Sequence, residues 1–170
     1  MDEEKIMLMQ QYIANIAISG STLRNQGAGK VAKEARKFLM QLKLKIFLEI
    51  QPEDYPGVLD KWTEDLKTKL PTGAQNWGTA RKALNVFLVQ VFMNKYLAKQ
   101  YGLSKFSDIP ETPLDSQATK KLRKIAGRGK LPRWDGIKRL KPEVSQRYQI
   151  FAADYAKQQG IPRSCLERIS

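Results

Sequence analysis

The sequence of 170 residues contains no histidine and a single cysteine, Cys165. Histidine and cysteine supply most of the ligands that hold transition metals in proteins, so their scarcity argues against a metal site or an iron–sulfur cluster. One cysteine cannot form an internal disulfide. We therefore predict a chain that uses no metal and no cofactor.

Long apolar stretches are also missing. No run of 18 or more apolar residues occurs, although a helix that crosses a bilayer needs about 20. The first residues are acidic, Asp2-Glu3-Glu4, unlike the positive start of a signal peptide. We expect a cytoplasmic protein without a membrane partner, associated with the nucleoid if its source is bacterial.

Negative charge is scarce relative to positive charge. Lys and Arg number 30 against 17 Asp and Glu, which gives a net charge of +13. Such an excess favours a polyanionic partner, nucleic acid before membrane, because cationic side chains release the counterions that surround phosphates. The hydrophobic content of 42% and the charged content of 28% are typical of a folded globular chain.

The positive charge is concentrated in residues 120–147, which we call the basic segment. It contains 11 basic residues and two acidic ones, Asp135 and Glu143. A charge run is ordinarily a solvated face, but this asymmetry favours a nucleic-acid-binding surface. We predict phosphate contacts from Lys120, Lys121, Arg123, Lys124, Arg128, Lys130 and Arg133. Trp134 either stacks on a base or is buried beside its apolar neighbours.

Apolar residues recur at helical spacing along most of the chain, as in residues 3–18, 60–70 and 144–156. We predict an all-α fold, a compact multi-helix domain of about seven to nine helices that spans residues 1–170. Two lobes, 1–69 and 70–170, that share one core are an alternative division. Residues 44–50 fit either a helix end or a strand.

One helix dominates the pattern. It begins after the Pro/Gly-rich turn 71–78, ends at Gly102, and is predicted to be the longest, most apolar and most central helix. Its polar residues are expected to lie away from the apolar face: Thr79, Arg81, Lys82, Asn85 and Lys95.

Three further features have two interpretations each. Residues 24–30 place Gly27-Ala28-Gly29 before a helix, either as a phosphate-contacting turn or as a plain helix start. Trp62 is expected in the core rather than on a stacking surface. Aromatic residues at helical spacing, which suggest core positions or a base pocket, are Tyr96, Tyr148, Phe151 and Tyr155.

Lys82 and Asp115 are the candidate catalytic residues. A lysine at a helix start, beside another cation such as Arg81, can act as an amine nucleophile. A carboxylate can deprotonate water or that amine, and it can stabilise a cationic sugar while a glycosidic bond breaks. Asp115 also suits the N-cap of a helix over residues 116–126. On a basic scaffold, this pair fits removal of a base from DNA.

The stretch around these residues resembles a known family. Leu70-Pro71, a glycine-containing turn and then residues 81–88, RKALNVFL, are similar to the helix-hairpin-helix of the endonuclease III-like (HhH-GPD) DNA glycosylases. Residues 113–116, PLDS, resemble the second motif of that family, in which a proline precedes the essential aspartate. The likeness covers about 45 residues and differs from the family in a longer hairpin, a wider spacing of 33 residues between Lys82 and Asp115, and Gln117 in place of a histidine.

The resemblance implies an all-α fold, extrusion of a nucleotide from double-stranded DNA, and cleavage of its N-glycosidic bond. It places Lys82 at the lysine that forms a Schiff base in members with lyase activity, and Asp115 at the essential aspartate. It places the hairpin glycines, Gly73 and Gly78, with Thr79 and Arg81, where the hairpin binds a DNA phosphate.

Two other functions fit the same sequence. The chain can be a non-catalytic DNA- or RNA-binding module that shares this scaffold, for example within a repair, defence or CRISPR-type protein assembly. It can also be a protein-interaction adaptor whose charge serves only solubility. We expect a DNA glycosylase, with or without lyase activity at abasic sites.

Overall fold

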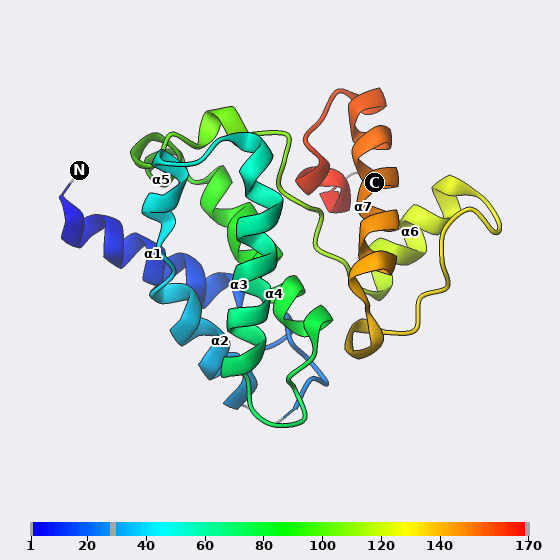
Figure 1. Cartoon of the computed structure of the whole chain (residues 1–170), viewed down its shortest axis with the longest axis horizontal. Coiled ribbons are helices and arrows are strands. Elements are labelled where there is room, and N and C mark those ends of the chain that lie inside the picture. The colour runs from blue at the N-terminus through cyan, green and yellow to red at the C-terminus, as the bar shows by residue number, and fades with distance from the viewer. Residues whose placement is uncertain (1, 28–29, 169–170) are drawn as a thin grey trace.

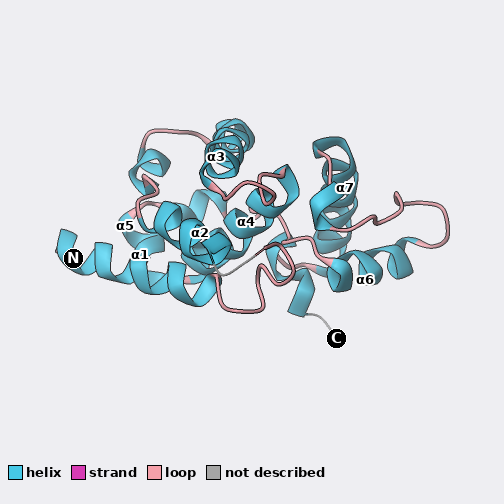
Figure 2. Ribbon diagram, turned by 90° about the horizontal axis from the view of Figure 1, so that it is seen from below, coloured by secondary structure: helices cyan, strands magenta, loops and turns pink. Residues whose placement is uncertain are grey.

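The computed structural model describes residues 2–27 and 30–168, and within them every regular element is a helix (Figures 1 and 2). This confirms the predicted all-α fold. The α-helices are α1 (Glu3–Ala17), α2 (Lys30–Met40), α3 (Tyr55–Lys69), α4 (Trp77–Met93), α5 (Lys95–Gln100), α6 (Ser116–Ala126) and α7 (Pro142–Gln159). Short 3-10 helices are η1 (Leu44–Leu48), η2 (Pro52–Asp54), η3 (Leu103–Phe106), η4 (Ile137–Arg139) and η5 (Arg163–Arg168). No helix of the described residues is long and apolar enough to cross a membrane.

The predicted long helix is divided in two, which corrects the expectation that it continues to Gly102. α4 ends at Met93, and Asn94 both ends α4 and caps α5, because its side-chain oxygen accepts hydrogen bonds from the backbone N–H groups of Tyr96 and Leu97. An asparagine side chain competes in this way with the backbone bonds of a continuous helix. The longest helix is α7, with 18 residues against 17 in α4.

α3 begins earlier than the apolar pattern suggests, at Tyr55 instead of residue 60. Pro56 does not separate two elements but lies in the first turn of α3. A proline is tolerated there because the first N–H groups of a helix have no partner inside the helix. The ambiguous stretch 44–50 is neither strand nor α-helix but the 3-10 helix η1.

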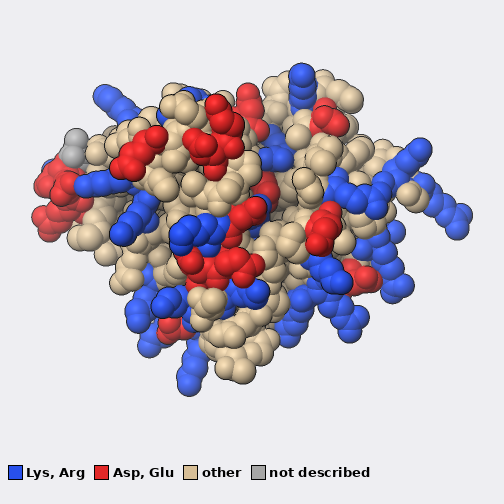
Figure 3. All heavy atoms as spheres, in the orientation of Figure 1, with Lys and Arg blue, Asp and Glu red and all other residues tan. Residues whose placement is uncertain are grey.

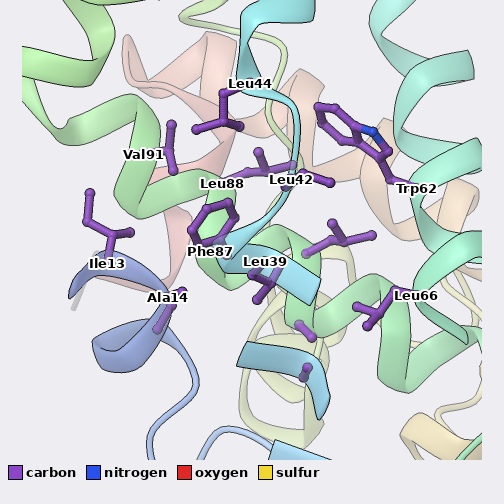
Figure 4. Close-up of a cluster of buried hydrophobic side chains, with 14 of the residues drawn as sticks. Ile13, Ala14, Leu39, Leu42, Leu44, Trp62, Leu66, Phe87, Leu88 and Val91 are labelled. Carbon is purple, nitrogen blue, oxygen red and sulfur yellow. The ribbon is translucent and has the colours of Figure 1, made fainter. Parts of the chain in front are cut away.

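α4 lies at the centre of the larger part of the molecule, packed against α1, α2 and α3 (Figures 1 and 2). Its apolar residues, with Leu39 from α2 and Leu66 from α3, form the buried cluster drawn in Figure 4. Trp62 is 8% exposed and belongs to this cluster, which confirms its predicted core position. Phe47 makes edge-on contacts with Trp62 and Phe106.

A second buried cluster holds α6 and α7 together at one side of α4 (Figure 2). Its members run from Leu114 to Leu166 and include Leu122 of α6 and Tyr148 of α7. The segment between Phe106 and Leu114 joins the two clusters. Residues 111–115 therefore pass from one cluster to the other, and this crossing positions the site described next.

Candidate functional site

Lys82 and Asp115 face each other across the junction of the two clusters. Nζ of Lys82, in the second turn of α4, lies 3.7 Å from Oδ2 of Asp115, the residue that precedes α6. The side chain of Lys82 is 16% exposed and that of Asp115 is 37% exposed. The pair is therefore partly shielded from water and still open to a ligand.

The two carboxylate oxygens of Asp115 have different surroundings. Oδ1 accepts hydrogen bonds from the backbone N–H groups of Gln117 and Ala118, both at 2.9 Å. These bonds cap the N-terminus of α6, whose bounds agree with the sequence prediction. Oδ2 is the oxygen that faces Lys82. The Asp115 side chain thus caps α6 through Oδ1 and faces the amine of Lys82 through Oδ2.

The residue next to Lys82 fixes the crossing segment to α4. Arg81 donates two hydrogen bonds to the carboxylate of Glu111, at 2.9 and 2.8 Å, and Asn85 donates a third at 2.8 Å. Arg81 also binds Asp60 of α3 at 2.8 Å. Glu111 lies four residues before Asp115. The hydrogen bonds to Glu111 therefore attach residues 111–115 to α4 at one end, and the Lys82–Asp115 pair attaches them at the other.

Burial makes the Arg81–Glu111 pair electrostatically important. Burial by itself raises the pKa of Glu111, but the hydrogen bonds and charge of Arg81 outweigh it, so the pKa lies below the ordinary value of 4.5. For Arg81, burial lowers the pKa of the guanidinium, and Glu111 and Asp60 more than reverse that effect. Both groups are therefore charged at neutral pH, and each compensates the other.

A pocket of about 650 Å³ opens beside Lys82 and Asp115, and we call it the Lys82 pocket. Its other walls come from the turn that precedes α2, from the start of α6 and from the segment around Trp134. The pocket is also lined by Arg24, Asn25 and Gln26. From the sequence, this turn was expected to be either a phosphate contact or a plain helix start, and its place beside Lys82 was not predicted. The polar, glycine-containing sequence of residues 24–30 was the feature that could have indicated a pocket wall. Ala28 and Gly29 of the same turn lie outside the described residues.

Gly78, Thr79 and Arg81 are buried, so the prediction that they contact nucleic acid is not supported by their positions. A Cβ atom on Gly78 would collide with the carbonyl oxygen of Ile137, so this glycine allows η4 to pack closely on α4. The hydroxyl of Thr79 donates to the side-chain oxygen of Gln26 at 2.9 Å. The polar residues of α4 were expected away from its apolar face, but Thr79, Arg81 and Asn85 are buried. The Thr79 hydroxyl donates to Gln26, and Arg81 and the side-chain NH2 of Asn85 donate to Glu111.

Gly73 is at an exposed position in the turn between α3 and α4, with φ of +90°. Glycine adopts this backbone angle readily, and other residues seldom do. The turn is not part of the wall of the Lys82 pocket. The structure therefore separates Gly73 from the Lys82–Asp115 pair.

The basic segment flanks the pocket. α6 starts at the pocket wall, and the loop after it returns to the pocket at Trp134. In the view of Figure 3, Lys and Arg side chains crowd the right-hand end over α6 and the following loop, whereas most acidic side chains lie over the left and centre. Of the seven predicted phosphate contacts, six are exposed: Lys120, Arg123, Lys124, Arg128, Lys130 and Arg133. Lys121 differs, because it is only partly exposed and its Nζ lies 3.4 Å from the carbonyl oxygen of Leu166.

Trp134 is partly buried beside its apolar neighbours. It packs against the second cluster, with its ring edge-on to Tyr148 at 6.3 Å between centroids, and it also lines the Lys82 pocket. The other aromatic candidates do not line this pocket. Tyr148 is buried, Phe151 and Tyr155 pack against the second cluster, and Tyr96 is exposed on α5.

Comparison with known proteins does not identify the chain. No family model, no curated protein and no solved structure matches it. The geometry of the Lys82 pocket and the sequence resemblance are therefore the grounds on which a function can be proposed.

Proposed function

We propose that this chain is a DNA base-excision glycosylase, with Lys82 and Asp115 as its catalytic residues and the basic segment as its DNA-binding surface. The observation that supports the proposal most is the 3.7 Å approach of Lys82 Nζ to Asp115 Oδ2 at the wall of an open pocket. The chemistry of their side chains and the family resemblance both single out these two residues, which lie 33 positions apart in the sequence.

In the proposed reaction, the N-glycosidic bond breaks and the base leaves with the bonding electrons. The negative charge of Asp115 stabilises the positive charge that develops on the sugar. Either water or Nζ of Lys82 then bonds to C1′. In this mechanism Oδ2 of Asp115, 3.7 Å from Nζ of Lys82, accepts the proton that the nucleophile loses.

Attack by Lys82 adds a second activity at abasic sites. The amine condenses with the aldehyde carbon C1′ of the opened sugar, water leaves, and an imine forms. Loss of a proton from C2′ then expels the 3′ phosphate and cuts the strand. This is the AP-lyase activity of the proposed enzyme.

The pocket and the surface around it suit a nucleotide extruded from a duplex. A volume of about 650 Å³ falls within the range of about 300–1,000 Å³ that is common for small-ligand sites. Trp134 offers a ring for stacking, and Arg24 adds a cation at the rim. The exposed cations of the basic segment would contact the phosphates on either side. We propose α3, the turn 70–76 and α4 as the helix-hairpin-helix element.

A non-catalytic DNA- or RNA-binding module, alone or within a larger protein assembly, is the second candidate. This candidate is favoured by the hydrogen bonds that Oδ1 of Asp115 accepts at the start of α6. Helix capping is a sufficient reason for an aspartate at this position, and it requires no catalytic role. The basic segment serves both candidates equally.

Base release separates the two. The wild-type chain is incubated with duplexes that each carry one deaminated, oxidised or alkylated base, and free base is measured by chromatography. The glycosylase proposal requires release from at least one duplex, and loss of that release in Asp115→Asn. Salt-dependent binding of every duplex with no release from any of them would favour the binding module.

A further inference from the structure

A second concentration of positive charge lies outside the basic segment. Residues 30–45 contain six Lys or Arg residues and a single acid, Glu34. Together with residues 120–147 they account for the whole positive excess, and the rest of the chain is close to neutral. The proposed glycosylase activity makes no use of this charge.

These cations border a groove of about 970 Å³ between α1, α2 and η1, which we call the α1–α2 groove. The cations that line it are Lys33, Arg36, Lys37, Lys43 and Lys45, and no carboxylate lines it. Arg36 is occupied by the carbonyl oxygen of Ile18, and Lys45 pairs with Glu3. Within the described part of the chain, Lys33, Lys37 and Lys43 make no ion pair, so their charges face the groove uncompensated.

The groove is apolar as well as basic. Met7 of α1 and Met40 of α2 line it, and Met7 is 52% exposed. Beside Met7, the exposed residues Leu8, Tyr12 and Ile16 follow one another at intervals of four along α1. Residues four apart lie on the same face of a helix, so these three form an exposed apolar stripe on α1 next to the face that lines the groove. Methionine side chains adapt their shape and are frequent at surfaces that bind helices.

The unpaired lysines and the apolar residues of the groove together indicate which class of partner would bind there. A nucleic acid would use the cations through its phosphates, but it would make no use of Met7 and Met40 in the groove wall. An amphipathic helix of another protein uses both features, with apolar side chains between the methionines and carboxylates against the unpaired lysines. The charge of the groove requires that this helix be acidic.

We propose that the α1–α2 groove is a docking site for an acidic amphipathic helix of a partner protein. The site lies apart from the Lys82 pocket, since the two share no lining residue. Docking there leaves the Lys82 pocket open, so a partner can remain bound while the chain engages DNA. The proposal is independent of the glycosylase activity.

The test uses a synthetic helix of about 18 residues, with leucines on one face and glutamates on the other, and a scrambled peptide of the same composition. Fluorescence anisotropy measures the affinity of each peptide for the wild-type chain and for variants whose folding is checked by circular dichroism. Lys33→Glu/Lys37→Glu removes groove charge, and Met7→Gln removes apolar surface at an exposed position. Lys120→Glu/Lys124→Glu makes the same charge change on α6.

The amphipathic peptide is expected to bind the wild-type chain more tightly than the scrambled peptide does. Each groove variant is expected to lower the affinity for the amphipathic peptide by about tenfold, because it removes either close charge pairs or a buried apolar contact. The α6 variant is expected to change this affinity by less than about threefold, because its charges are remote and screened. Equal binding of both peptides would overturn the proposal. It would also be overturned if Lys33→Glu/Lys37→Glu weakened duplex DNA binding as strongly as Lys120→Glu/Lys124→Glu, since the groove would then belong to the nucleic-acid surface.

Discussion

Nζ of Lys82 lies 3.7 Å from Oδ2 of Asp115, although 33 residues separate the two in the sequence. The intervening residues form the end of α4, α5, η3 and an irregular segment that returns to the start of α4. The long separation that distinguishes this chain from the family it resembles is therefore no obstacle to the pairing. Glu111 anchors the returning segment to Arg81 and Asn85 just before Asp115 is reached.

Asp115→Asn should separate the capping role of Asp115 from its charge. Asparagine caps a helix about as well as aspartate, whereas alanine does not, so Asp115→Ala should be less stable than Asp115→Asn by about 1 kcal/mol. Base release or strand cleavage should fall by about a hundredfold or more in both variants, because both lack the carboxylate. Urea unfolding and single-turnover kinetics measure the two effects. Full activity in Asp115→Asn with loss in Asp115→Ala would mean that only the cap matters.

Glu111→Gln should destabilise the fold and change its response to acid. The free energy of unfolding should fall by about 3 kcal/mol, because buried Arg81 loses its buried charged partner and keeps only the largely exposed Asp60. Asp60→Asn is the matched control, and it should cost less than about 1 kcal/mol because Asp60 is 65% exposed.

The pH dependence follows from the lowered pKa of Glu111. The stabilisation from this group is fully present above the ordinary pKa of 4.5 and is lost as the pH falls through the lower folded-state pKa. Urea unfolding between neutral pH and pH about 3 should therefore show a stability gap between wild type and Glu111→Gln that narrows in acid. A gap that stays constant over this range would contradict the assignment of Arg81 and Glu111 as a charged pair.

Gly78→Ala tests whether Gly78 serves packing. The added methyl group meets the carbonyl oxygen of Ile137 and Cβ of Leu140, so the free energy of unfolding should fall by about 1–3 kcal/mol. Gly57→Ala is the control, since a Cβ at Gly57 in α3 meets nothing within 4 Å. It should be neutral or stabilising, by up to about 1 kcal/mol. Thermal unfolding of both variants decides the matter, and equal stability of the two would contradict the close approach of η4 to α4.

The sequence predicted the helical fold because apolar periodicity is local information, as in residues 116–126, where the prediction and α6 coincide. It could not predict the break at Asn94, because the same side chain is tolerated within a helix when tertiary contacts favour continuity. Lys82 and Asp115 were accessible to chemical reasoning and to the family resemblance. The burial of Arg81 could not be predicted from the sequence. Its partner Glu111 lies 30 residues away, in a segment whose sequence resembles a solvent-exposed loop.

Charge reversal in the basic segment should weaken DNA binding and its dependence on salt. We expect a triple Glu variant of the exposed residues Lys120, Arg123 and Lys124 to bind a duplex at least about tenfold more weakly. The slope of log affinity against log salt should become shallower by about 0.9 for each phosphate that the variant no longer neutralises. The control carries the same change at exposed positions elsewhere: Lys5, Lys69 and Lys99. If both triples weakened binding equally, net charge rather than the basic segment would account for binding.

Borohydride trapping on a duplex with one abasic site tests most directly the central claim that Lys82 is a catalytic nucleophile. The imine between Nζ of Lys82 and C1′ takes up hydride and becomes a stable secondary amine, which joins protein and DNA in a band visible on a denaturing gel. We predict that wild type and Lys95→Ala, a change at an exposed lysine of α5, form this band, and that Lys82→Ala does not. An undiminished band in Lys82→Ala, or none in wild type, would contradict Lys82 as the nucleophile.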